Sequence, residues 1–161
     1  MDVRVAQARD WLLLKNARLS ALLDTPSAFG MSYQTAAGYS DDEWKTRASS
    51  TTGVTFWLAV EQNKAVGLAG GHINASGRYN LIAMWVDPQL RGSDVASQLV
   101  GAVKHDALQR QYRQVYLEVS PDNHRAVSFY QKQGFAFINE WEPLDSNPDI
   151  QLQTMIWNSA T

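Results

Sequence analysis

The chain has 161 residues, of which 45% are hydrophobic and 19% are charged, and its formal net charge is −2. This size and composition are typical of a folded soluble protein whose core fits one domain, here the whole chain from 1 to 161. The charge lacks the basic excess of nucleic-acid-binding proteins, and the absence of cysteine excludes disulfides, thiolate metal sites and a cysteine nucleophile.

Metal and membrane binding are also disfavoured. The three histidines, His72, His105 and His124, lie far apart and show no H-x-x-x-H spacing, so we expect no metal site. The N-terminus carries charges where a signal peptide needs an apolar core, and no apolar stretch is long enough to span a membrane. We therefore expect a cytoplasmic protein that binds neither nucleic acid nor membranes.

The N-terminal third of the chain shows helix caps and stop signals. Ser40, followed three residues later by Glu43, is the capping-box pattern, in which each side chain bonds the backbone N–H of the other residue. The stretch 29–40 has no period and predicts an ordered loop. The expected elements are a strand at Val3–Ala6, a helix capped by Asp10 that runs to about Leu23, and a short helix from Ser40 to near Ser50.

Strand signals dominate the rest of the chain, apart from two helices. Three β-rich segments separated by turns predict a run of antiparallel strands, and apolar residues from Val95 onward recur at spacings of three and four. The last two strands are expected to be joined by a polar loop with Pro143 and Pro148. The expected strands are 55–61, 65–73, 79–86, 114–119, 135–139 and 150–157, and the expected helices are 95–107 and 123–133, the second followed by Gly134 as its C′ residue.

The stretch from Met84 to Gly134 contains two halves of a candidate site. In the first half, a strand leads through an Arg91-Gly92 turn into a helix. The first N–H groups of a helix are unpaired and favour an anion, Gly92 can adopt unusual backbone angles, and the small Ala96 allows close packing. Taken alone, such a turn is more often only a turn than a phosphate site.

The second half places Asn123, Val127 and Tyr130 on one helix face at i, i+4 and i+7, with Ala126 beside them. The Asn123 amide both donates and accepts hydrogen bonds, which suits an amide-containing chain such as pantetheine. The Tyr130 hydroxyl can protonate a leaving group. The alternative interpretation is structural, with Tyr130 in the core and Asn123 at the start of the helix.

Together the two halves resemble the GNAT superfamily of acetyl-CoA-dependent N-acyltransferases. Arg91-x-x-Asp94-x-Ala96 lies where the family has its Q/R-x-x-G-x-G/A pyrophosphate loop, and "DNHRAVSFYQKQGF" is similar to its Asn-x-x-Ala-x-x-x-Tyr-x-x-x-Gly-Phe segment. The resemblance implies an α/β (α+β) fold with a mixed, mostly antiparallel sheet of about seven strands flanked by helices. It implies acetyl-CoA as cosubstrate, no metal, and a small-molecule or protein amine as acceptor, and it leaves a homodimer open.

The resemblance also assigns roles to individual residues. Tyr130 matches the acid that protonates the leaving thiolate, and backbone N–H groups near the end of the fourth strand match those that polarise the thioester carbonyl. The "LEV" strand is similar to that of the ribosomal-protein N-terminal acetyltransferases, where the glutamate, here Glu118, is a proposed base. His72 is the rival base. The implied cofactor-binding residues are Met84, Trp85, Val86, Arg91, Gly92, Ser93, Asp94, Val95, Ala96, Asn123, Ala126 and Tyr130.

The C-terminal region is acidic, because no lysine or arginine follows Lys132. An acidic rim with a tryptophan would attract a cationic amine, although a solvated surface loop is the plain alternative. In the family this region borders the acceptor site, as does the loop that follows the first helix. The candidate substrate residues are Tyr33, His72 and Trp141, with Glu140, Glu142, Asp145, Asp149 and Tyr39 nearby in sequence.

One residue departs from the family pattern. Asp94 stands where the family has its middle glycine, so it brings a negative charge to a loop that should wrap a pyrophosphate. The milder alternative is that Asp94 turns outward or caps the helix. This departure favours a second functional hypothesis, a CoA-binding or regulatory module with little or no turnover.

Overall fold

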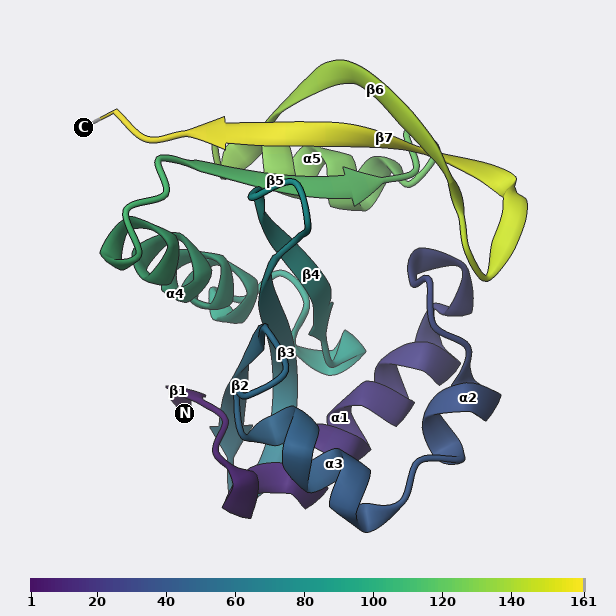
Figure 1. Cartoon of the computed structure of the whole chain (residues 1–161), viewed down its shortest axis with the longest axis vertical. Helices are drawn as coiled ribbons and strands as arrows, with labels where there is room; N and C mark the ends of the chain where they lie inside the picture. The colour runs from purple at the N-terminus through teal and green to yellow at the C-terminus, as the bar shows by residue number, and fades with distance from the viewer. Residues whose placement is uncertain (161) are drawn as a thin grey trace.

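The computed structural model describes residues 1–160, apart from the side chain of Ser27, and it is built around one seven-stranded sheet. The strand order is β1-β2-β3-β4-β5-β7-β6, and only the β4–β5 pair is parallel (Figure 1). The expected mixed, mostly antiparallel sheet is therefore confirmed. The strands are β1 (Asp2–Val5), β2 (Val54–Glu61), β3 (Lys64–Ile73), β4 (Tyr79–Val86), β5 (Gln114–Val119), β6 (Ala136–Leu144) and β7 (Asn147–Asn158).

Helices cover both faces of the sheet (Figure 1). On one face, α1 (Trp11–Asp24), α2 (Tyr33–Ala37) and α3 (Asp41–Ala48) enclose one cluster of buried apolar side chains. On the other face, α4 (Val95–Gln109) and α5 (His124–Lys132) enclose a second cluster. The three-and-four spacing in the sequence of α4 places Leu99, Val100 and Val103 in this core, and none of the three is exposed to solvent.

The helix caps agree with the sequence at α3 but not at α1. The Oγ of Ser40 accepts from the Glu43 N–H at 3.2 Å and the Glu43 carboxylate accepts from the Ser40 N–H at 3.4 Å, so the capping box is confirmed. Asp10 precedes α1, but the expectation that its side chain caps this helix is wrong. Its carboxylate instead accepts from the Gln7 N–H at 2.9 Å and from Arg4 Nη2 at 3.0 Å, around the 3-10 turn η1 (Ala8–Asp10).

The expected loop at 29–40 contains the helix α2. Ser32 caps it, with its Oγ accepting from the Thr35 N–H at 3.2 Å, and Ala36 docks fully buried against the core. A helix of five residues is too short to show a periodic pattern in its sequence. The prediction of an ordered loop without helix is therefore wrong at residues 33–37.

The expected polar loop between the last two strands is also wrong, because β6 and β7 extend into one long hairpin. Pro143 is accommodated because β6 is an edge strand, where a missing N–H leaves no sheet partner unsatisfied. The hairpin turn reaches the segment that follows α1, where Ser146 Oγ donates to the Phe29 carbonyl at 2.6 Å. This contact places the C-terminal hairpin beside the N-terminal helices, as Figure 1 shows.

Candidate active site

The central feature of the candidate site is the opening between β4 and β5. The two strands are in register only at Asn80 and Tyr116 and then separate, and Figure 1 shows β5 leading away from β4. β4 also bulges at this opening, where the register with β3 shifts and Ala83 adopts a positive φ of 57°. The bulge turns the backbone before Met84 away from regular pairing, so N–H groups there are able to face the opening.

The loop before α4 has the backbone of an anion site. Gly92 has a φ of 88°, a conformation that favours glycine. Asp94 occupies the N-cap position of α4 but its side chain makes no capping hydrogen bond. Its Oδ2 accepts instead from Gln98 Nε2 at 2.9 Å, and Ser93 Oγ accepts weakly from the Val95 N–H at 3.4 Å. The cap alternative for Asp94 is therefore wrong, and the following N–H groups of the helix stay available to an anion.

Arg91 of this loop is held by a residue that the sequence reasoning missed. Its guanidinium forms an ion pair with Asp24 at the end of α1, and Asp24 also accepts a hydrogen bond from Trp85 Nε1 at 3.3 Å. The Asp24 carboxylate thus connects the loop before α4 to β4, next to the bulge. No local pattern marks this role, since Asp24 and Arg91 lie 67 residues apart in sequence.

Tyr130 lies on α5, and Asn123 is the N-cap residue that precedes it. Tyr130 is partly buried against the rings of Phe129 and Phe135, with centroid distances of 5.4 and 5.9 Å. Burial raises its pKa above the ordinary tyrosine value, so the phenol stays protonated, and within residues 1–160 its hydroxyl has no hydrogen-bond partner. Asn123 caps the helix through Oδ1, which accepts from the Ala126 N–H at 3.4 Å, and its amide nitrogen remains able to donate.

Glu118 lies on the opposite face of the sheet from Tyr130. Its neighbours Leu117 and Val119 point into the core that α4 and α5 cover, whereas Glu118 points the other way. Burial, followed by the nearby carboxylates of Glu142 and Asp145, raises the pKa of Glu118. The acid and base candidates therefore lie on opposite faces of the sheet, in which β4 and β5 separate beyond Asn80.

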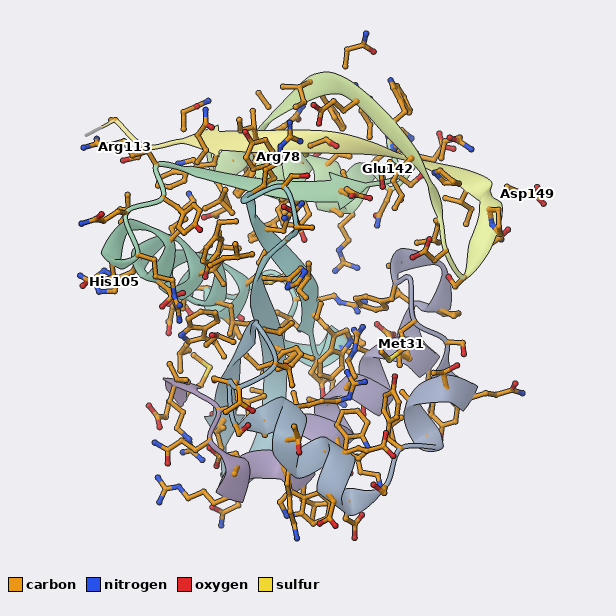
Figure 2. The ribbon with its side chains drawn as sticks, viewed as in Figure 1. Met31, Arg78, His105, Arg113, Glu142 and Asp149 are labelled. Carbon is orange, nitrogen blue, oxygen red and sulfur yellow. The ribbon has the colours of Figure 1, made fainter. Side chains whose placement is uncertain are left out.

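Glu118 also lines a polar cavity of about 400 Å³, which we call the acidic groove. Its only basic lining residue is Arg78, which is already engaged by a two-pronged ion pair with Glu140, at 2.6 and 2.9 Å, and by the ring of Tyr116, 4.3 Å from its guanidinium carbon. Figure 2 shows Arg78 and Glu142 beside the ribbons of β5 and β7. The lining residues are Asn74, Ser76, Arg78, Asn80, Tyr116, Glu118, Glu140, Trp141, Glu142 and Thr154.

The remaining candidate residues are dispersed. Trp141 lines the acidic groove, half exposed, with Nε1 donating to Asn139 Oδ1 at 3.2 Å. His72 lies on β3, where its Nδ1 is 3.3 Å from the Gly53 carbonyl, and Tyr33 is exposed on α2. Neither lines the acidic groove. Within residues 1–160, no cluster of side chains suited to a metal ion is present and no helix is long and apolar enough to cross a membrane.

Comparison with known proteins gives one family and many related folds. The sequence model of the acetyltransferase (GNAT) family matches residues 19–135. No curated protein matches the sequence significantly.

Among solved structures, an aminoglycoside 6'-N-acetyltransferase complexed with coenzyme A is 17% identical, with a TM-score of 0.72 over 98% of this chain and 97% of that one. A ribosomal-protein-alanine N-acetyltransferase from Brucella melitensis is 15% identical, with a TM-score of 0.75 over 98% and 99% of the two chains. An acetyltransferase of the GNAT family from Staphylococcus aureus Mu50 is 18% identical, with a TM-score of 0.72 over 98% and 99%. At these identities the likeness shows a shared fold.

Proposed function

The chain belongs to the GNAT family of acetyltransferases, and we propose that it transfers an acetyl group from acetyl-CoA to a primary amine by direct attack. The observation that carries this proposal is the separation of β4 and β5 beyond Asn80, together with the placement of Tyr130 on one face of the sheet and Glu118 on the other. Direct attack needs both groups at one opening and no nucleophile on the protein, in keeping with the absence of cysteine.

The residues around the opening fit acetyl-CoA, which supplies the acyl group as an activated thioester. The backbone around Gly92 and the uncapped start of α4 would hold the pyrophosphate, and the Asn123 amide would bind the amide-containing arm. Backbone N–H groups from Met84 to Val86 would stabilise negative charge on the thioester oxygen. The coenzyme A complex of a related fold supports the same choice of cosubstrate.

Proton movement balances the reaction. A C–N bond forms to the amine as the C–S bond breaks, the proton that the amine loses passes to Glu118, and the thiolate that leaves is protonated either by Tyr130 or, while hydrogen-bonded to it, by solvent. Because the pKa of Tyr130 is raised while a thiol titrates near 8.5, a complete transfer is uphill. A hydrogen bond from Tyr130 to the developing thiolate is therefore its main contribution.

Acceptor candidates follow from the related folds, which include enzymes named for aminoglycosides and for ribosomal-protein alanine. The decisive experiment measures CoA release from acetyl-CoA with and without a panel of amines, with mass spectrometry of the products. We expect release that depends on an amine and matches the acetylated amine in amount. Release that is independent of every amine in the panel would contradict the proposal.

A second candidate function is a CoA-binding module with little turnover. Two observations favour it. The Asp94 carboxylate lies at the start of α4, next to the loop that would bind the pyrophosphate, and the Asp24 carboxylate neutralises Arg91 of that loop. Both reduce the positive potential that a pyrophosphate would meet. CoA binding without any amine-dependent turnover would support this alternative.

A further inference from the structure

The acidic groove contains several carboxylates besides Glu118. Glu118 and Glu142 line it, and Asp145 lies close enough to act on the Glu118 carboxylate. Within residues 1–160, no lysine or arginine forms an ion pair with any of these three side chains. Arg78 already forms an ion pair with Glu140. The negative charges of the other carboxylates in the groove are therefore not neutralised by a basic side chain.

A second observation at the floor of the groove also points to a ligand. Thr154 is 7% exposed, lines the groove and faces Glu118 across the β5–β7 pair. Within residues 1–160 its hydroxyl has no hydrogen-bond partner. The hydroxyl oxygen therefore remains able to accept a hydrogen bond from a molecule bound in the groove.

The pairing of β6 with β7 is irregular at Thr154. β6 pairs with β7 at Phe137↔Met155 and again at Trp141↔Gln153, so three residues of β6 bulge opposite the single residue Thr154. The bulge is closed by Gln153 Nε2, which donates to the Ile138 carbonyl at 3.1 Å. β6 and β7 therefore form no regular pair at Thr154.

We infer that the groove binds a second cationic group of the acceptor, so that the preferred substrates are aliphatic diamines or polyamines rather than monoamines. This inference rests on the proposed acetyl transfer. The reacting amine would lie at Glu118, beside the opening, and the distal ammonium would bind Glu142 and the Trp141 ring. The Thr154 hydroxyl oxygen would accept from an ammonium N–H between them.

The test compares diaminobutane, with one amine at each end, and aminobutane, which lacks the distal amine. We expect the diamine to have a kcat/KM higher by about tenfold, because hydrogen bonds to charged groups are the stronger ones. The ratio should fall several-fold in Glu142→Gln and in Thr154→Val, and it should also fall as ionic strength rises. A ratio near one in the wild type would overturn the inference.

The matched control is Asp149→Asn, which removes the same charge from the same hairpin but outside the groove. Figure 2 shows Asp149 at the far end of that hairpin, away from Glu142. Asp149→Asn should leave the diaminobutane-to-aminobutane ratio of kcat/KM unchanged. If this ratio falls as much as in Glu142→Gln, the preference comes from overall charge and the proposed binding site is wrong. An aminoglycoside and a peptide with an N-terminal alanine complete the panel. Acetylation of the peptide faster than that of diaminobutane would overturn the inference that the acceptor is a small polycation.

Calorimetric titration separates this inference from the proposed function. Diaminobutane and aminobutane are titrated into the protein saturated with CoA, in which no acetyl transfer takes place. Tighter, Glu142-dependent binding of the diamine with no acetylation of any amine would overturn the proposed function and leave the binding site standing. Amine acetylation with equal binding of the two compounds would overturn the second cation site and leave the transferase standing.

Discussion

Tyr130 is the residue whose hydroxyl the proposed mechanism uses most directly. Replacing it with phenylalanine removes a hydrogen-bond donor and keeps the ring that packs against Phe129 and Phe135. We expect Tyr130→Phe to lower kcat by about 100-fold or more, with little change in the Kd of acetyl-CoA. Steady-state kinetics with calorimetry of CoA binding test this, and an unchanged kcat would make Tyr130 a core residue only.

Glu118 should govern the acidic limb of the pH profile of kcat/KM. Its pKa is raised by burial and by the charges of Glu142 and Asp145, so the limb should lie above the ordinary glutamate range, and activity should fall as Glu118 is protonated at lower pH. Glu118→Gln should flatten this limb. Glu142→Gln should move it to lower pH, because a removed negative charge makes Glu118 easier to ionise.

The pH profile of each variant is the measurement for this prediction. An acidic limb that keeps its shape and position in Glu118→Gln would mean that the base lies elsewhere. His72→Asn would then be the next variant, although His72 does not line the acidic groove.

At the scale of elements, the start of α4 should bind CoA more tightly without Asp94. Asp94→Gly removes a negative charge beside the anion loop, and it loses only an exposed hydrogen bond to Gln98, because the carboxylate does not cap the helix. The gain should be about 1 kcal/mol, since the site is exposed. Calorimetry at two salt concentrations should show a gain that shrinks with salt. Weaker CoA binding in the variant would mean that Asp94 contributes to binding CoA.

Position 71 on β3 has no room for a side chain, because Tyr79 at the start of β4 packs against it. A Cβ at this position would clash with the hydroxyl of the buried Tyr79 side chain, which donates to Asp106 at 2.7 Å. Gly71→Ala should therefore destabilise the fold by about 1–3 kcal/mol. The control is Gly101→Ala in α4, where a Cβ meets nothing within 4 Å and alanine should stabilise the helix by about 1 kcal/mol. Urea denaturation of both variants measures the difference.

At the scale of the whole molecule, two buried clusters lie on the two faces of one continuous sheet, and from this we infer a single domain over 1–161. The contact between Ser146 and the Phe29 carbonyl joins the C-terminal hairpin to the N-terminal helices on the same side as Glu118. The candidate cofactor and acceptor sites thus share one rigid framework.

Binding of acetyl-CoA should consequently stabilise the entire fold. A ligand that binds only the native state adds about 2.7 kcal/mol at about a hundredfold excess over its Kd. A thermal melt with millimolar acetyl-CoA or CoA should therefore show a higher Tm than one without ligand. No shift with either compound would remove the cofactor from the proposed function and with it both proposals for this chain.

The sequence by itself determined the features that depend on short-range patterns. The apolar spacing of α4, the Ser40–Glu43 capping box and the strand Tyr79–Val86 each follow from residues within one element, where neighbouring side chains and backbone groups decide the conformation. The resemblance of the two motifs around Arg91 and Tyr130 to the GNAT superfamily likewise predicted the family, because each motif lies within a short stretch of sequence.

Only the tertiary structure decided how distant groups meet. Arg78 and Glu140 are 62 residues apart, and Arg91 and Asp24 are 67 residues apart, so no local pattern marks either pair. The bulge opposite Thr154 depends on the register between β6 and β7, and the sequence of either strand alone does not specify it. Charge pairing and register are properties of two chain segments packed together, which is why the acidic groove could be described only once the sheet was assembled.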